Sequence, residues 1–426
     1  MSKSTVSPTR SYPGGLTRHD VVAWRNATFT IFGVCGIGMA SWIARVPAVR
    51  DSLGASTLQM GMLIFGLAAG SILGLLASGH IIARFGAART IVWCLTIGPI
   101  GLAFAGVFAT IGPSFAAVFA GLAVFGAAFS ITDVSMNVSG AANERVSGHS
   151  IMPIFHACFS FGTMLGAGGG ALAEWIGLPI AIHMAIIAAV MTVGAHLAVR
   201  FLQSEHLVAE GIDVSVEEHD RSKTWRGRLD MWRDSRTLLI GLIVLGMAFA
   251  EGSANDWLAL AMVDGHGVDN ATGAIVLGVF VTAMTVGRLL GVLVLDRYGR
   301  VPVLRASAAL ATIGLLIVIF VPSAWIATIG VVLWGLGSAL GFPVGMSAAA
   351  DDPKTAAARV SAVATIGYCA FLVGPPLIGF LGEHIGLLHG LLVVLVLVAL
   401  AGIVSHAARE PHPVASAGPA EPTAAQ

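Results

Sequence analysis

The stretch LLIGLIVLGMAFAEGSANDWLALAMV at residues 238–263 decides how this chain folds. It is long enough to cross a bilayer, because roughly 20 helical residues span a hydrocarbon core about 30 Å thick. It also carries Glu251, Asn255 and Asp256, and an ionisable side chain at that depth costs roughly 2.5–3.5 kcal/mol on insertion scales. The stretch therefore predicts a membrane helix that faces a watery or protein-lined interior.

Two interpretations of these polar residues remain open from the sequence. Glu251 and Asn255 are four residues apart and share one helix face, whereas Asp256 points about 100° away. The cluster could hold neighbouring helices together, or it could be a substrate or proton site.

The composition is that of an integral membrane protein. Hydrophobic residues make up 56% of the chain and charged residues 11%, whereas soluble domains carry about 25% charge. The mean hydropathy is +0.86. The formal net charge is zero, so no basic surplus points to nucleic acid.

Several other functions lack their motifs. The four cysteines lie singly in separate apolar segments and have no metal-ligand or disulfide spacing. No phosphate-binding glycine loop followed by Lys-Ser or Lys-Thr occurs, which argues against an ATP-driven pump. We expect no cofactor and no metal. The first 20 residues lack the apolar core of a signal peptide, so the first helix is expected to be retained.

Apolar stretches recur along the chain and predict an all-α protein with twelve transmembrane helices. If both termini are cytoplasmic, 20 of the 23 Lys and Arg residues lie at or near the cytoplasmic face. Arg45 and Arg50 lie outside, and Arg288 lies within a helix. That asymmetry follows the positive-inside rule and predicts cytoplasmic termini. The stretches are 22–47, 57–82, 88–110, 115–141, 150–173, 177–201, 238–263, 271–294, 301–322, 324–349, 355–381 and 386–408.

The two halves of the chain resemble each other. Gly-His-Ile-Ile-Ala-Arg-Phe-Gly ends the second apolar stretch, and Leu-Asp-Arg-Tyr-Gly-Arg ends the eighth. Arg84 and Arg297 are 213 residues apart (297 − 84), which is half of 426. A duplicated six-helix unit is the simplest account, and it predicts two pseudo-symmetric bundles.

These loops carry a family resemblance. The chain resembles the major facilitator superfamily, whose loop signature runs Gly-x-x-x-Asp-Arg-x-Gly-Arg. The second copy keeps Asp296, Arg297, Gly299 and Arg300, with Gly291 one place too early; the first keeps Gly79, Arg84 and Gly86 but has Ala83 at the acidic position. The resemblance implies a cytoplasmic gate in which Asp296 alone latches the N-terminus of a neighbouring helix.

Within that superfamily, four stretches are similar to a bacterial branch that includes the rhizopine-cluster membrane protein and related uncharacterised permeases. This resemblance says little about substrate. The stretches are Ser-Trp-Ile-Ala-Arg-Val-Pro at 41–47, Asp-Val-Ser-Met-Asn at 133–137, Phe-His-Ala at 155–157 and Glu-Gly-Ser-Ala-Asn-Asp-Trp at 251–257.

Counting at about 1.5 Å per residue from the helix ends places the polar residues at two depths. One layer, about 6–12 Å from the cytoplasmic face, holds Asp133, Asn137, His156 and Arg288. Here we expect Arg288 to be the counter-charge of Asp133. Glu251 lies about 20 Å deep, near the midplane.

Polar groups farther out form the second set of candidates. Asp256 lies nearer the outer end, where Arg45 could pair with it as an outer gate. The remaining candidates for the cavity or substrate site are Asn255, Trp42 and Trp257.

Glu251, Asp133 and His156 are the candidate proton-coupling residues, with Glu251 as the alternately protonated carboxylate. A lone histidine on an apolar helix is more often a packing residue, so His156 could be either a packing residue or a proton carrier. Glycines repeat every fourth residue in three rows, which we interpret as packing surfaces. The rows are 66, 70 and 74; 162, 166 and 170; and 337, 341 and 345. Pro343 and the run Gly-Pro-Pro at 374–376 are expected to bend their helices.

The predicted organisation is a cytoplasmic tail (1–21), an N-terminal bundle (22–201), a cytoplasmic linker (202–236), a C-terminal bundle (237–408) and a disordered tail (409–426). The predicted function is secondary active transport of a small polar solute by alternating access, coupled to protons. We expect a multi-pass monomer in the bacterial plasma (inner) membrane. The alternatives are an uncoupled facilitator or exporter, a transport-dead sensor, and a polytopic membrane enzyme.

Overall fold

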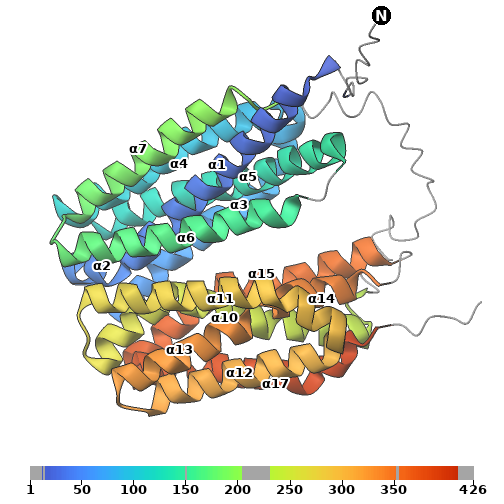
Figure 1. The fold of residues 1–426 in the computed structure, drawn as a ribbon. Coiled ribbons are helices and arrows are strands. Elements are labelled where there is room, and N and C mark those ends of the chain that lie inside the picture. Colours follow the sequence, from blue (N-terminus) through green and yellow to red (C-terminus); the bar gives the residue numbers. More distant parts are fainter. Residues whose placement is uncertain (1–11, 13–14, 149–150, 204–230, 352–354, 411–426) are drawn as a thin grey trace, which may run out of the picture.

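The chain folds into two helical lobes that lie side by side (Figure 1). The computed structural model describes residues 12, 15–148, 151–203, 231–351 and 355–410. The N-lobe comprises α1 (Arg18–Ala44), α2 (Val46–Leu53), α3 (Thr57–Phe85), α4 (Ala87–Thr110), α5 (Phe115–Ser147), α6 (Met152–Trp175) and α7 (Ile180–Val199). The C-lobe comprises α10 (Ser235–His266), α11 (Asn270–Tyr298), α12 (Arg300–Phe320), α13 (Ala324–Ser338), α14 (Gly341–Ala349), α15 (Ala356–Ile385), α16 (Leu387–Gly390), α17 (Leu392–Val404) and η3 (Ser405–Ala408).

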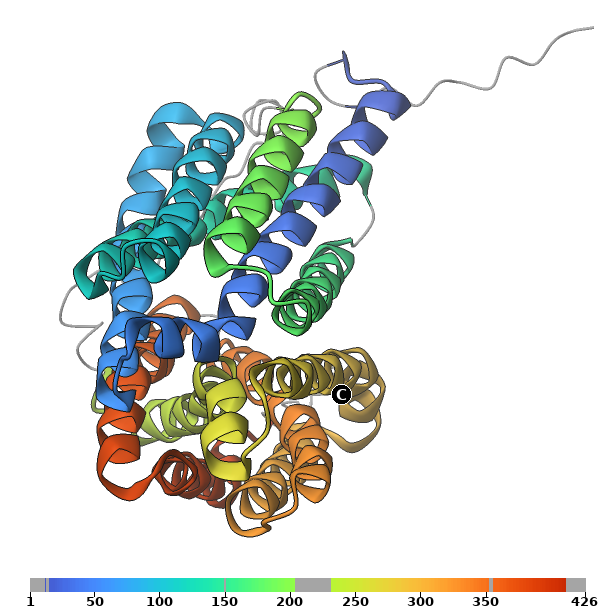
Figure 2. The ribbon, with the colours of Figure 1, turned by 90° about the vertical axis from the view of Figure 1, so that its left-hand side faces the viewer.

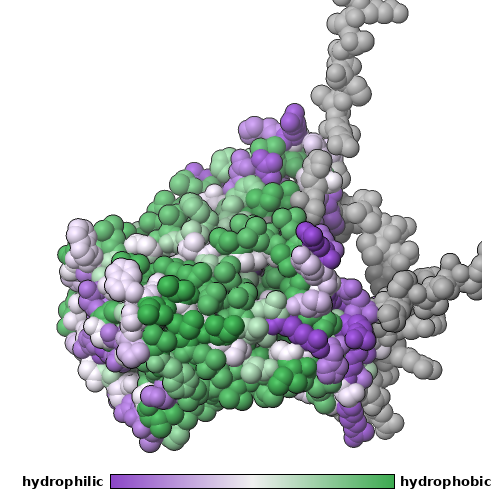
Figure 3. All heavy atoms as spheres, turned by 60° about the horizontal axis from the view of Figure 1, so that its bottom comes forward, coloured by the Kyte–Doolittle hydropathy of each residue, from purple (hydrophilic) through white to green (hydrophobic). Residues whose placement is uncertain are grey.

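In the described part of the chain, 11 helical segments are long and apolar enough to cross a membrane, and α6 is not among them. The expected all-α membrane architecture is confirmed at that level. The predicted linker and C-terminal tail lie largely outside the described residues. Figure 3 shows an apolar belt between two more polar ends, as a lipid-facing surface requires.

The lobes meet through a few helix pairs and separate at one end. We call the end that carries α2 the α2 end, and the end where α1 begins and η3 finishes the terminus end. Across the lobe boundary, α3 packs against α15, α6 against α11 and α2 against α10. Figure 1 shows the lobes close together at the α2 end and apart at the terminus end; Figure 2 views the α2 end directly.

The glycine rows act as packing surfaces, as predicted. A Cβ on Gly70 would lie 2.1 Å from the carbonyl oxygen of Ala123, and one on Gly74 would lie 2.3 Å from that of Ala127. These contacts bring α3 against α5. A Cβ on Gly162 would lie 2.2 Å from the carbonyl oxygen of Gly33, which is the corresponding contact between α6 and α1. In the C-lobe, a Cβ on Gly337 of α13 would lie 2.4 Å from the Ala311 backbone nitrogen, whereas Gly341 and Gly345 of α14 face side chains of α10.

Prolines have two different effects. The helix that contains Pro343 is interrupted at Ala339–Leu340, where α13 ends and α14 begins. α15 instead runs unbroken through Pro375 and Pro376. The Pro375 carbonyl oxygen, which would lie only 2.7 Å from a Cβ on Gly61, faces α3 across the lobe boundary.

Replacing Gly70 by Ala tests the packing role. Because the added Cβ would meet backbone, which cannot rotate away, we expect a loss of about 1–3 kcal/mol in the free energy of unfolding. Thermal unfolding of the purified protein in detergent measures this loss. Gly169→Ala is the matched control, because nothing lies within 4 Å of its Cβ position. Equal unfolding temperatures for both variants would contradict the interpretation.

Candidate functional site

Two adjoining cavities lie between the lobes, with volumes of about 320 Å³ and about 200 Å³. Both are lined by the same four residues where they meet: Met39, Ile43, Phe129 and Asn255. The larger cavity contains the carboxylates of Asp133 and Asp256, and we call it the acidic arm. The smaller contains Glu251 and Arg288, and we call it the ion-pair arm.

In the ion-pair arm, Arg288 Nη2 donates to both carboxylate oxygens of Glu251, at 2.8 and 2.9 Å. The Arg288 Nε also lies 3.4 Å from the Ala339 carbonyl oxygen, where α13 gives way to α14. The side chains of Glu251 and Arg288 are 19% and 37% exposed. The guanidinium is thus held between a carboxylate of α10 and the broken helix.

This pairing corrects the predicted one, in which Arg288 faced Asp133. Side chains lean toward the N-terminus of their own helix. α11 runs away from the α2 end, so Arg288 leans back toward it, while Glu251 on the oppositely directed α10 leans toward the terminus end. Counting residues had placed the Cα atoms of Glu251 and Arg288 at different depths. Because their side chains lean toward each other, they meet despite that difference.

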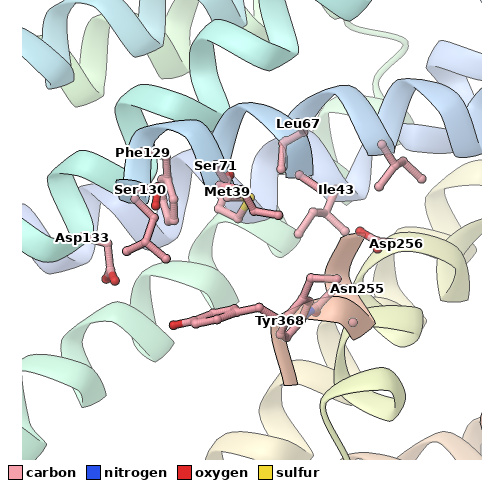
Figure 4. Close-up of a pocket in the computed structure, with 16 residues that line it drawn as sticks. Met39, Ile43, Leu67, Ser71, Phe129, Ser130, Asp133, Asn255, Asp256 and Tyr368 are labelled. Carbon is pink, nitrogen blue, oxygen red and sulfur yellow. The ribbon is translucent and has the colours of Figure 1, made fainter. Parts of the chain in front are cut away.

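The acidic arm brings together residues from both lobes. Figure 4 shows Asp133 of α5 and Asp256 of α10 toward its two ends, with Phe129 and Ser130 on one side and Tyr368 of α15 on the other. Sequence reasoning missed Tyr368. The available signal was a tyrosine within an apolar helix of a chain that has only 3 tyrosines.

The other residues of the predicted layer lie apart. Asn137 and Asp133 do share a face, and the Asn137 side-chain amide donates to the backbone carbonyl oxygen of Asp133 at 2.8 Å. The His156 ring is exposed and packs edge-on against Phe32, with 5.2 Å between ring centroids. Neither Asn137 nor His156 lines the described cavities.

The predicted Arg45–Asp256 pair is wrong. Arg45 Nε lies 3.1 Å from Glu174, and its Nη2 donates to the Leu178 carbonyl oxygen at 2.9 Å. Burial lowers the pKa of Arg45, and the charge of Glu174 opposes this effect. Arg45 follows the end of α1 and turns into its own lobe, between α6 and α7, whereas Asp256 faces the acidic arm. Glu174, at the end of a neighbouring helix, was the missed partner.

Trp42 and Trp257 belong to the core and not to the cavity wall. They are 2% and 0% exposed, and neither lines the two cavities. Their large rings are part of the hydrophobic core.

Polar contacts at the α2 end join the lobes. Arg50 of α2 forms an ion pair and hydrogen bond with Asp264 of α10. The Asn270 side-chain amide donates to Asp51 at 3.0 Å, and the backbone N–H of Leu58 donates to Glu383 of α15 at 3.2 Å. Together these contacts hold the lobes close at the α2 end, whereas the cavity residues Asp133 and Tyr368 are exposed.

The two signature loops have matching local geometry. Gly86 and Gly299 both adopt positive φ, at 79° and 74°, where an L side chain would be strained. The guanidinium of Arg84 lies 5.4 Å from the ring centre of Phe85, and that of Arg297 lies 5.3 Å from the ring centre of Tyr298. In these two loops, corresponding residues of the predicted internal repeat therefore have the same local geometry.

The expected Asp296 latch is not formed in this conformation. Asp296 is exposed, and the structure gives it no hydrogen bond or ion pair with any residue it describes. The N-terminus of α6 is capped instead by Glu144, whose carboxylate accepts from the Ile151 and Met152 N–H groups, each at 2.7 Å. The lobes are apart at the terminus end, and the part of the chain that the structure describes gives Asp296 no partner in the other lobe.

The remaining motif residues have distinct surroundings. Arg300 binds Asp351 at 2.6 Å, and Arg236 binds the same carboxylate at 2.8 Å. This cluster ties the starts of α10 and α12 to the residues after α14. Nothing lies within 4 Å of the Cβ position of Gly79, so close packing does not require glycine there.

Two helical lobes around central cavities that hold carboxylates and an ion pair, within an apolar belt, define a multi-pass membrane transporter. The model of the Major Facilitator Superfamily matches residues 27–260 and 252–425. This chain belongs to that superfamily, and it is a transporter rather than an enzyme.

Curated relatives agree with this assignment. An uncharacterised MFS-type transporter of Yersinia pestis is 30% identical over 84% of this chain and 88% of its own. The membrane protein MosC of Rhizobium meliloti is 27% identical over 90% of both chains. MosC lies in the branch to which the sequence motifs pointed.

Solved structures share the fold. A point mutant of the nucleoside transporter NupG is 15% identical, covers 91% of this chain and 98% of its own, and superimposes with a TM-score of 0.71. A bacterial Spinster homologue in an inward-facing, unoccupied conformation has the same TM-score of 0.71 at 14% identity, covering 93% of this chain and 100% of its own. The transporter FucP in its outward conformation gives 0.59 at 14% identity, covering 92% and 100%.

The ion pair predicts a specific pattern of stability. Arg288→Gln leaves the Glu251 carboxylate without its cation in a half-buried arm, so we expect a loss of about 1–3 kcal/mol in the free energy of unfolding. Adding Glu251→Gln removes the unpaired charge and should restore most of that loss. Thermal unfolding of both single variants and the double variant near neutral pH measures the coupling. Additive losses would contradict the pairing.

Proposed function

We propose that this protein moves a small polar solute across the bacterial inner membrane by alternating access, coupled to protons. In this proposal α6 also crosses the membrane, which brings the 11 candidate spans of the described residues to twelve. Both termini are then cytoplasmic. The positive charges support that orientation, because Arg84, Arg297 and Arg300 all lie at the terminus end. The conformation described here is then open to the cytoplasm and closed at the α2 end.

The Glu251–Arg288 pair is the observation that carries proton coupling. A carboxylate in an apolar surrounding remains charged while a cation holds it, and it takes up a proton when that cation is drawn away. Arg288 lies on a helix that packs against α6 of the other lobe. Movement between the lobes can therefore change the distance between Arg288 and Glu251 and so exchange a proton with the cavity.

Asp133 and His156 have weaker support as coupling residues. The described lining of the acidic arm holds no cation beside Asp133, and His156 is not among the described lining residues of either arm. We therefore place the exchanged proton on Glu251 and give Asp133 a role in solute binding.

Glu251→Gln tests the coupling. The amide has the shape of the protonated acid but cannot release a proton, so we expect solute-driven proton movement to disappear while solute exchange across the membrane continues. The measurement uses proteoliposomes with an internal pH-sensitive dye and sugars, amino sugars, nucleosides and amino acids as trial solutes. Glu410→Gln, at an exposed carboxylate outside the spans, is the matched control.

The outcomes separate the competing functions. Unchanged proton movement in Glu251→Gln would remove Glu251 from the mechanism. Tracer flux in the unaltered protein without proton movement would identify an uncoupled facilitator. Solute binding without flux would identify a sensor.

The α2-end contacts predict a shift between open states. Arg50→Glu places like charges against Asp264, so we expect the α2 end to open more often, by a few-fold, because pairs of this exposure contribute about 0.2–1 kcal/mol. Spin labels at Ile111→Cys and Trp325→Cys, on opposite lobes, report the separation. Adding Asp264→Arg should restore the original distance distribution. An unchanged distribution in Arg50→Glu would contradict this role.

A further inference from the structure

The acidic arm has an unbalanced charge. Its charged lining residues are Asp133 from the N-lobe and Asp256 from the C-lobe, and no Lys, Arg or His is among its described lining residues. The neighbouring arm differs, because Glu251 and Arg288 there neutralise each other. Arg288 is the one basic side chain in the described lining of the two arms, and it is already paired with Glu251.

Among the residues that the structure describes, neither carboxylate has a positively charged partner. For Asp256 the described residues provide no hydrogen bond and no ion pair, although it is partly buried. Asp133 accepts a side-chain contact from Asn137 at 3.4 Å, which is too long to neutralise a charge. A charged carboxylate next to apolar surface is costly unless it takes up a proton or something of opposite charge joins it, and a cation in the arm would hold both carboxylates in their charged form.

The rest of the arm combines an aliphatic wall, which includes Ile64, Leu67 and Ile72, with aromatic and polar side chains that suit a positively charged group carrying hydroxyls. The rings of Phe129, Tyr368 and Phe371 line it, and aromatic faces attract cations within about 6 Å. Ser130 and Asn255 add a hydroxyl and an amide, for which the described residues likewise supply no hydrogen bond. Figure 4 shows the Tyr368 hydroxyl directed toward the side of the cavity where Asp133 lies.

We propose that the acidic arm binds the ammonium group of the solute, and that the solute is a small hydroxylated amine. This inference rests on the proposed transport function and names its substrate class. Asp133 and Asp256 supply the negative charge, the aromatic rings pack against the carbons next to the nitrogen, and Ser130, Asn255 and Tyr368 bind hydroxyl groups. Because the carboxylates come from opposite lobes, a bound amine contributes attraction between the lobes that an uncharged solute does not.

The charge selection can be tested without knowing the solute. In a variant whose four cysteines are replaced by alanine, Ser130→Cys places one thiol in the acidic arm. Its reaction rate with a trimethylammonium thiosulfonate is compared with that of a sulfonate-bearing thiosulfonate, each divided by the rate for a small free thiol. Thr285→Cys, in the ion-pair arm, is the matched control.

We expect the cationic reagent to be favoured at least about tenfold at Ser130→Cys, since a cleft lined by one sign of charge concentrates the opposite sign by 10-fold or more. The preference should fall toward one when Asp133→Asn and Asp256→Asn are added. At Thr285→Cys it should stay within about threefold of unity, because its neighbouring charges are paired. A ratio near one at Ser130→Cys, or a preference for the anion, would overturn the proposal.

Protection by small molecules gives the second measurement. Glucosamine should slow modification of Ser130→Cys more than glucose or gluconate does at matched concentration, because these share a scaffold and differ in charge. Stronger protection by glucose or gluconate would overturn the proposal. Both experiments use protein in detergent, so proton-coupled flux without cation selection would refute this inference and leave the transport function standing.

Discussion

The requirement that a charge inside a membrane have a partner organises this molecule. Glu251 lies midway along a helix otherwise buried in apolar packing, and it is kept by two contacts from one Arg288 nitrogen, at 2.8 and 2.9 Å. That pairing places α10 and α11 in register with each other. It also places the break between α13 and α14 against the guanidinium, through the carbonyl oxygen of Ala339.

Close backbone packing supplies the rigid parts that such a pair needs. Without a hydrophobic driving force between helices in lipid, contact area and close approach determine how they pair. Glycines hold α3 against α5 and α6 against α1, which makes these helix pairs of the N-lobe rigid. Between the lobes, α3 packs against α15 and α6 against α11, and polar contacts at the α2 end add to this packing.

In the proposed mechanism, the two arms of the cavity have separate tasks. The ion-pair arm is electrically balanced, and its Glu251 and Arg288 both belong to the C-lobe, where they suit an exchangeable proton. The acidic arm is unbalanced and lies between the lobes, where a solute of opposite charge would complete it. In that mechanism, solute binding and proton exchange would influence each other through Arg288, which lines the same arm as the shared residue Asn255.

The sequence by itself determined the helices, the internal repeat, the family and the packing role of the glycines, because these depend on local hydropathy and on spacing along one helix. It also identified nearly every charged residue of the cavity. Only the tertiary structure decided their partners: Arg288 with Glu251, Arg45 with Glu174, and Tyr368 opposite Asp133. The physical reason is that counting residues gives the depth of a Cα atom, whereas the direction of a long side chain and the rotation of each helix determine which charges meet.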